Sequence, residues 1–252
     1  IMTPDKYASM NNQLIEVYRK WAEEIKKEHP KFLEDQYSNP YYACVPNGWI
    51  DSNVRILIVG EEGFGQWGMG KSDGAEFDDI DTIQRYNWSL ISGNLHCINK
   101  HWLYSYVEND SLIKSPFWNR IRKLAEFGIC AWTNNDLLHH LGKYSKDCRL
   151  SDEERKELHS PNCNVLRNII EVLNPTHIVF FGWYGVSLEP ELPEVFKELY
   201  PKGLGDKSKW FKNVVSITNG ERVYLFTYHP SWGCRQKGYE DKVMEMFKSN
   251  LP

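Results

Sequence analysis

The sequence lacks the cysteine spacings that metal and cluster sites require. Its six cysteines form no C-x-x-C pair, and none of their spacings resembles a zinc knuckle or an iron–sulfur motif. The N-terminus also lacks the apolar stretch of a secretory signal. We therefore expect reduced thiols in a cytoplasmic protein, with no metal and no cofactor. The cysteines are Cys44, Cys97, Cys130, Cys148, Cys163 and Cys234.

Neither the charge nor the hydrophobic pattern marks the chain for a membrane or for bulk nucleic-acid binding. The 252 residues include 30 Lys+Arg and 34 Asp+Glu, a formal net charge of −4, whereas bulk-electrostatic binders of nucleic acid carry a basic excess. The longest apolar run is about five residues, far below the ~20 that cross a bilayer. What the chain does have is 41% hydrophobic residues, ample for a folded core. We expect one domain over residues 1–252, with no membrane partner.

Buried strands and amphipathic helices alternate along the chain. An opening helix has its apolar residues at helical spacing and ends at His29-Pro30. Continuous β-branched runs predict buried parallel strands, and Asn219-Gly220 predicts a hairpin turn between residues 214–218 and 222–227. Strands are expected at 55–60, 129–133, 177–182 and 222–227. Helices are expected at 11–29, 116–127, 165–173 and 239–247, with further helical patterning at 80–107 and 195–199.

This alternation predicts an α/β fold with a parallel sheet between layers of helices. We expect a three-layer α/β/α sandwich whose central, mainly four-stranded parallel sheet has the order 2-1-3-4. Residues 1–53 are expected to form an N-terminal helical extension. In such folds the ligand cleft lies beyond the carboxyl ends of the strands. The polar residues that follow each strand are therefore the candidate site.

Three strand ends carry side chains that suit chemistry. Gly60-Glu61-Glu62-Gly63-Phe64 follows the first strand, and its paired carboxylates suit acid/base work. Asn134 follows the second strand, and an amide that both donates and accepts suits the edge of a nucleobase. His229 follows the last strand before the stiff Pro230, and an imidazole there can donate to developing negative charge. Each has a structural alternative: a solvated acidic turn, a helix-capping amide and a structural histidine.

A glycine-rich loop overlaps the first of these segments. Residues Gly65 to Ser72 fit the pattern G-x-x-x-x-G-K-[ST]. A phosphate-binding loop also needs a strand directly before it and a helix that begins at Lys71-Ser72. Here the pattern starts five residues after the strand, and the acids that follow it would repel phosphate. Nucleotide hydrolysis through this loop remains a third-ranked alternative.

Taken in order, these segments resemble the uracil-DNA glycosylase superfamily. Gly60-Glu61-Glu62-Gly63-Phe64 is similar to its first motif, G-Q-D-P-Y in the best-known branch. Thr133-Asn134 stands where the family places its base-reading Asn, and His229-Pro230-Ser231 matches its final H-P-S motif. The resemblance covers roughly residues 54–250. Two further matches are Leu173-Asn174-Pro175 with the strand after it, and Ser115-Pro116-Phe117-Trp118-Asn119-Arg120, which is similar to the mismatch-specific branch.

The resemblance implies a hydrolase that flips a damaged base out of nucleic acid and cleaves its N-glycosidic bond. In that reaction His229 stabilises the negative charge on the base, and Glu62 positions water or stabilises the sugar cation. Asn134 reads the base edge, Phe64 closes the pocket, and Ser231 contacts phosphate. Gly60, Glu61 and Gly63 complete the binding loop. Other implied roles are a wedge, at Trp232 or Arg235, and a stacking aromatic, at Phe77, Trp88 or Phe117.

A different class of function uses the same scaffold without catalysis. The chain carries Glu62 and Gly63 where the best-known branch has Asp and Pro. A longer acid and a looser loop, together with the net negative charge, would suit a binder of nucleobases, nucleotides or nucleic acid. We expect nucleic acid, most simply DNA, or another nucleobase-containing ligand as the partner, and a monomeric protein.

Overall fold

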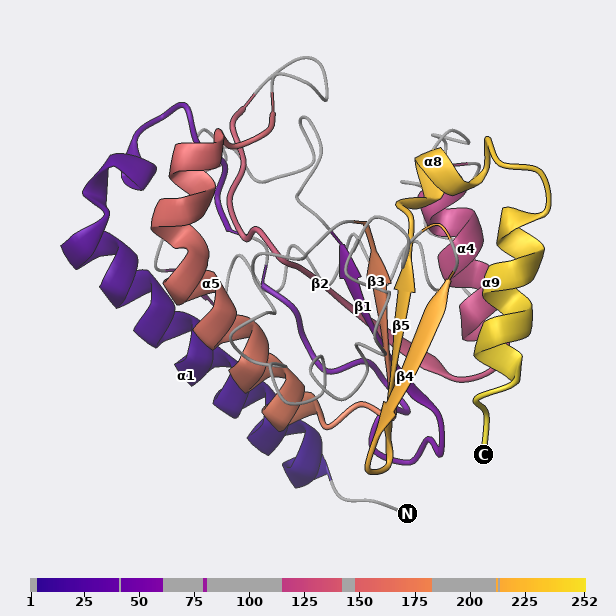
Figure 1. The fold of residues 1–252 in the computed structure, drawn as a ribbon. Helices are drawn as coiled ribbons and strands as arrows, with labels where there is room; N and C mark the ends of the chain where they lie inside the picture. The colour runs from indigo at the N-terminus through magenta and orange to yellow at the C-terminus, as the bar shows by residue number, and fades with distance from the viewer. Residues whose placement is uncertain are drawn as a thin grey trace, which may run out of the picture.

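The computed structural model describes residues 4–40, 42–60, 79–80, 115–141, 148–182, 212 and 214–252. A single sheet lies at its centre (Figure 1), and it has five strands in the order β2-β1-β3-β5-β4. The strands are β1 (Arg55–Gly60), β2 (Ile129–Asn134), β3 (His177–Phe181), β4 (Val215–Asn219) and β5 (Arg222–Thr227).

The sheet is mostly parallel, which confirms the predicted mixed α/β fold. β1 pairs in parallel with β2 and with β3, and β3 pairs in parallel with β5. The predicted hairpin forms, because β4 runs antiparallel to β5 with Asn219 opposite Arg222. The sequence favoured mainly four strands, whereas the first arm of the hairpin adds a fifth strand at the sheet edge.

Alternate residues of each central strand pack on opposite faces of the sheet. In β1, Leu57 and Val59 belong to one apolar cluster, whereas Ile56 and Ile58 belong to the other. Every one of these four side chains is fully buried. Such continuous burial requires cover on both faces, and it explains why the run carries no polar residue.

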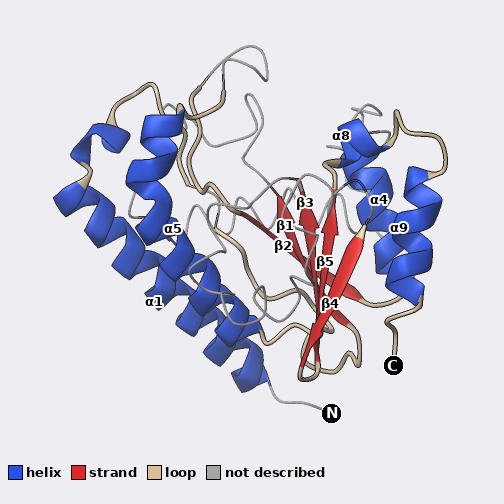
Figure 2. Cartoon of the chain, viewed as in Figure 1, coloured by secondary structure: helices blue, strands red, loops and turns tan. Residues whose placement is uncertain are grey.

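One helix pair covers each face. On one face lie α1 (Pro4–Glu28) and α5 (Asp152–Leu173); on the other lie α4 (Pro116–Ala125) and α9 (Tyr239–Lys248). Figure 2 shows the pairs on opposite sides of the strands. Two short helices complete the described elements: a 3-10 helix at Pro30–Leu33 and α8 (Pro230–Gly233) directly after β5.

The helix starts follow from their capping residues. Ser115 accepts the amide of Trp118, with Pro116 in the first turn of α4, as an N-cap serine followed by proline predicts. α5 begins with a capping box in which Ser151 and Glu154 bond each other's backbone amides. This start lies well before residue 165, where the apolar periodicity becomes strong.

The first fifty residues contribute a large part of one apolar cluster. Tyr18 and Trp21 of α1 are buried, and the Trp21 indole donates to Asn162 of α5 at 3.2 Å. In the segment that follows, Tyr42 and Trp49 are fully buried. The Trp49 indole donates to the carbonyl of Leu173 at 2.8 Å. This N-terminal segment therefore packs against α5 and the sheet through many large side chains.

Several predicted elements lie outside the described residues. These are most of the helical pattern at 80–107 and the helix at 195–199. Among the helices that the structure does describe, none combines the length and the apolar character needed to cross a bilayer.

Candidate functional site

The candidate site lies at the carboxyl edge of the parallel strands. β1, β2, β3 and β5 run in one direction, so their last residues share one edge of the sheet. In Figure 1 the arrowheads of β1, β3 and β5 point toward the end at which α8 lies. Two of the predicted site residues are direct neighbours there, because Gly60 and Asn134 are paired across β1 and β2.

Asn134 has a fixed amide orientation. Its Oδ1 accepts the indole N–H of Trp132 at 3.0 Å. An indole nitrogen can only donate, so the amide atom that meets it must be the oxygen. Trp132 lies two residues earlier in β2, on the same face as Asn134. The amide nitrogen Nδ2 therefore has to point elsewhere.

The Nδ2 group of Asn134 is buried without an acceptor. Asn134 is 2% exposed, and Nδ2 makes no hydrogen bond within the part of the chain that the structure describes. A buried donor left unpaired costs about 1–3 kcal/mol, so such groups call for an explanation. A ligand that offers an acceptor would supply the missing partner.

Gly60 leaves the room that the Asn134 amide occupies. A methyl group at Gly60 would overlap Oδ1 of Asn134 and would crowd the indole nitrogen of Trp132. Glycine is required here for close approach of a side chain. The last residue of β1 therefore leaves space for the side-chain amide of Asn134 in β2.

His229 is held as a neutral hydrogen-bond donor. It is the N-cap of α8, and its Nδ1 accepts the amide of Ser231 at 3.3 Å. A neutral imidazole that accepts at Nδ1 carries its proton at Nε2. Burial, with added repulsion from Arg120 and Arg149, lowers the pKa of His229 to about 4. The imidazole is therefore uncharged at neutral pH, with Nε2–H available as a donor.

An aromatic wall connects these two groups. The ring of Phe117, at the start of α4, stacks on the His229 imidazole with a centroid separation of 6.0 Å. The same ring packs edge-on against Trp132 at 5.3 Å. Phe117 therefore contacts both the catalytic candidate and the residue that orients Asn134. Phe117 is also one of the three aromatics proposed from the sequence for base stacking.

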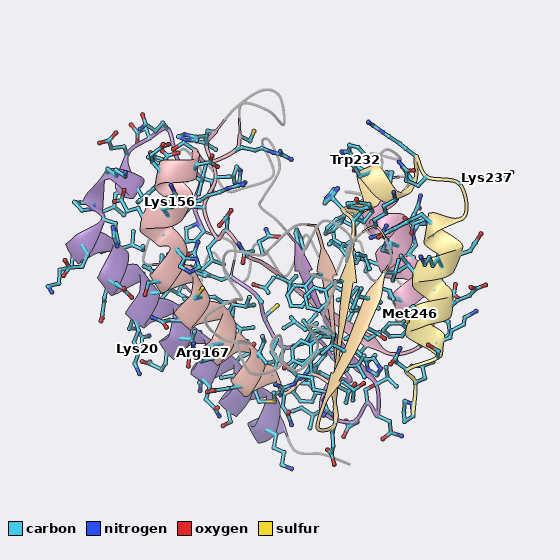
Figure 3. All side chains as sticks on the ribbon, viewed as in Figure 1. Lys20, Lys156, Arg167, Trp232, Lys237 and Met246 are labelled. Atoms are coloured by element: carbon cyan, nitrogen blue, oxygen red, sulfur yellow. The ribbon has the colours of Figure 1, made fainter. Side chains whose placement is uncertain are left out.

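The turn around α8 presents an exposed aromatic side chain. Trp232 is 59% exposed, and its ring lies 6.0 Å from that of Tyr228. Ser231 is exposed beside it. Figure 3 shows Trp232 on α8 and Lys237 in the turn that leads to α9, at the same end of the molecule. An exposed ring with cations nearby suits contact with bases and phosphates.

The first-motif residues lie outside the described residues. Glu61, Glu62, Gly63 and Phe64 all fall in that part of the chain, and so do Lys71 and Ser72 of the glycine-rich loop. Phe77 and Trp88 lie there as well. The described portion of the predicted site comprises Gly60, Asn134, His229 and Ser231.

Two residues to which the sequence analysis assigned no role contact the described part of the site. Trp132 fixes the Asn134 amide, and buried Arg120 contacts the end of β5 next to His229. The signal for Trp132 was its spacing, because residues two apart in a strand share a face. No pattern in the sequence indicated that Arg120 turns inward from α4.

No metal cluster forms in the residues that the structure describes: no group of three His, Cys, Asp or Glu side chains there could hold an ion. The adjacent histidines 139 and 140 instead meet protein partners. His139 Nδ1 lies 3.0 Å from Ser38 Oγ, and His140 Nε2 lies 3.0 Å from Glu154 Oε2. Both have structural roles between the N-terminal segment and α5.

Comparison of the sequence with protein-family models gives no match, and comparison with curated proteins gives none either.

Proposed function

We propose that this protein is a glycosylase-like hydrolase that cleaves the N-glycosidic bond of a uracil-type or otherwise damaged base in nucleic acid. The observation that carries the proposal is a buried Asn134 amide whose Nδ2 has no acceptor among the described residues, connected through the rings of Trp132 and Phe117 to a neutral His229. Glu62 and His229 are the proposed catalytic residues. The proposed substrate-binding residues are Gly60, Glu61, Gly63, Phe64, Asn134 and Ser231.

The two described groups offer the same kind of interaction. Asn134 Nδ2 is a donor with no acceptor among the described residues, and neutral His229, which accepts at Nδ1, carries its proton at Nε2. A pyrimidine such as uracil carries keto oxygens that accept from such donors. Phe117 stacks on His229 and packs against Trp132, which bonds Asn134. Its apolar ring suits a flat heterocycle. These features together favour a keto-bearing heterocycle over a sugar or a peptide.

Glu62 is the proposed source of the carboxylate. It follows Gly60 by two residues, so its Cα lies no more than about 7 Å from that of Gly60. Gly60 in turn lies directly opposite Asn134. This short separation along the chain supports the proposal that Glu62 positions water or stabilises the sugar cation, the roles that the resemblance implies.

In the proposed reaction the bond between the sugar C1′ and the base nitrogen breaks. Its electron pair goes to the base, and the negative charge on a keto oxygen is stabilised by the N–H of His229. Water adds to the cationic sugar carbon, and its proton passes to the Glu62 carboxylate. The products are the free base and an abasic sugar. A neutral imidazole suits this step, since it donates a hydrogen bond without having to lose a proton.

Nucleic acid, most simply DNA, is the proposed partner of a monomeric, cytoplasmic enzyme. The exposed ring of Trp232 would serve as the wedge that pushes the base out of the stack. The cations Arg149 and Lys237 are both exposed near the site, and they would contact phosphates despite the net negative charge.

The proposal includes the fold. We infer a three-layer α/β/α sandwich in which the four parallel strands follow the family order 2-1-3-4. Support comes from the two helix pairs that pack on opposite faces of the sheet. In an arrangement of this kind a base pocket opens beyond the carboxyl ends of the strands.

The test is base release from oligonucleotides that contain uracil or hypoxanthine, as single strands and as duplexes. We expect an abasic product, detected by alkaline strand cleavage. Glu62→Gln and His229→Asn should each lower the rate about 10²-fold or more. Two matched controls are Glu245→Gln on the exposed face of α9 and His159→Asn on α5, and both should retain the wild-type rate.

Two results would contradict the proposal. One is a wild-type rate in the double variant E62Q/H229N. The other is saturable binding of uracil-containing DNA by the wild-type protein with no abasic product. This second result would favour the non-catalytic binder on the same scaffold.

A further inference from the structure

Arg120 is a buried cation that contacts the end of β5, next to the candidate site. It projects from α4 and is 1% exposed, and its side chain has no solvent contact. A buried guanidinium is costly unless its N–H groups find partners. The partners of Arg120 therefore indicate what the residue is for.

All its described hydrogen bonds go to two places. One is Glu240 of α9, whose two carboxylate oxygens accept from Nε, at 2.9 Å, and from Nη2. The other is the end of β5, where Nη1 donates to Thr227 Oγ1 at 2.9 Å and to the Tyr228 carbonyl at 2.6 Å. The guanidinium group of Arg120 thus connects α4 to both α9 and the end of β5 through its N–H donors.

These contacts surround His229 along the chain. Thr227 and Tyr228 directly precede it, and Gly233 follows it by four residues. A methyl group at Gly233 would come within 2.5 Å of Arg120 Nη2, so glycine lets the turn close over the guanidinium. The amide of Tyr228 also donates to the Tyr239 hydroxyl at 2.7 Å. The backbone on both sides of His229 is therefore fixed against α4 and α9.

The same helix holds the imidazole ring. Phe117 lies three residues before Arg120 on α4, on the same face of the helix, and stacks on His229. α4 thus supports His229 twice, through the ring and through the backbone. The charged groups that act on the imidazole are Arg120 from α4 and Arg149 from the segment before α5. Glu240 is paired with Arg120.

We propose that Arg120 is a positioning residue for His229, holding the end of β5 and the α8 turn so that the imidazole is presented in one place and one protonation state. The inference rests on the proposed function, because it assigns the purpose of that placement to the reaction. It gives Arg120 a role that the motif resemblance does not supply. A purely structural ion pair would stabilise the fold without governing the behaviour of His229.

The experiment compares Arg120→Lys with the double variant R120L/E240L. Lysine keeps the charge but loses the fork, whereas the double variant replaces the ion pair by apolar side chains, which folded proteins often tolerate. The matched control is Phe247→Leu, which weakens packing between α9 and the sheet at the end where His177 begins β3. All variants are first ranked by thermal unfolding.

Two readouts separate positioning from stability. The first is the imidazole titration of His229, followed by NMR. We expect its pKa to rise in the double variant, which removes the charge of Arg120 and its bonds to the end of β5, and to stay low in Phe247→Leu. The second is base release, for which we expect kcat to fall about 10²-fold with little change in KM.

The inference is overturned if the folded double variant keeps the wild-type imidazole titration. It is also overturned if the Phe247→Leu control shifts that titration as much. The NMR titration of His229 does not depend on catalysis. It therefore tests the positioning role of Arg120 even if the protein releases no base. Absence of base release from the wild-type protein would instead overturn the proposed function.

Discussion

Acidification should destabilise this protein through His229, at a pH above the range in which the Glu154 carboxylate titrates. Burial and two arginines lower the pKa of His229 in the folded protein to about 4, whereas an unfolded histidine titrates near 6.5. The unfolded chain therefore takes up the proton at a higher pH than the folded chain. The stability from the neutral imidazole is fully present above about pH 6.5 and is lost as the pH falls toward 4.

The size of the effect follows from the two pKa values. At about pH 4.5, unfolded His229 is almost fully protonated and folded His229 is mostly neutral, which lowers the free energy of unfolding by about 2.5 kcal/mol relative to pH 7.5. The imidazole keeps some contact with solvent, which screens its interactions, so this value is an upper limit. The partly buried carboxylate of Glu154 has a pKa of about 2, so its effect on stability falls at lower pH.

The assay is urea unfolding at about pH 7.5 and about pH 4.5 for the wild type and His229→Asn. Asparagine keeps an acceptor at the N-cap of α8 but does not titrate. Burial also lowers the pKa of His177, and this contribution cancels because both proteins contain it. We expect the wild type to lose about 2 kcal/mol more than the variant over this range.

An equal loss of stability in the two proteins between about pH 7.5 and about pH 4.5 would refute the reasoning. If the wild type and His229→Asn lose the same stability between these pH values, His229 is not held neutral by the fold. The argument for an uncharged donor at Nε2 would then fail with it.

Three further substitutions test the site. Trp132→Phe removes the N–H that orients Asn134, and we expect the preference for uracil over cytosine to fall about tenfold in competition binding of the free bases. Gly60→Ala places a methyl group on the Asn134 amide; uracil binding, measured by calorimetry, should be lost, and unfolding should show a cost of about 1–3 kcal/mol. Trp232→Ala should change stability by less than about 0.5 kcal/mol and weaken oligonucleotide binding about tenfold by fluorescence anisotropy.

Two of these substitutions have a matched control, and two have a stated result that would contradict them. Trp118→Phe alters a neighbouring indole that packs on Trp132 at 5.6 Å, and it should leave the base preference intact. An unchanged preference in Trp132→Phe would show that the indole does not orient the amide. Leu141→Ala removes another exposed apolar side chain and should leave oligonucleotide affinity unchanged. Uracil binding that survives in Gly60→Ala would place the ligand away from Asn134.

The sequence predicted the parts of the fold that depend on local patterns. The run from Arg55 to Gly60 indicated a strand buried on both faces, and the structure pairs it on both sides. Asn219-Gly220 predicted the hairpin that β4 and β5 form. The sequence predicted β4 as a hairpin arm but did not count it in the central sheet. A hairpin arm and an edge strand of the sheet have the same local pattern.

The candidate site was predictable only where strand ends meet. Asn134 and Gly60 could be placed together because parallel strands share a carboxyl edge. The inward turn of Arg120 could not, since it depends on Glu240, which lies 120 residues away in sequence. Nor does the sequence alone reveal that Trp132 Nε1 reaches Asn134, because that contact depends on side-chain rotamers.

The burial of Tyr42 and Trp49 bears on how the protein can be handled. Their rings belong to the apolar cluster between the sheet and the helices beside it, so a fragment that begins near residue 54 would lose this packing. Deletion of residues 4–53 would strip large aromatic and aliphatic surfaces of their cover and should yield aggregates. Any smaller derivative, for instance for fusion to a DNA-targeting module, has to keep this segment and carry its additions elsewhere.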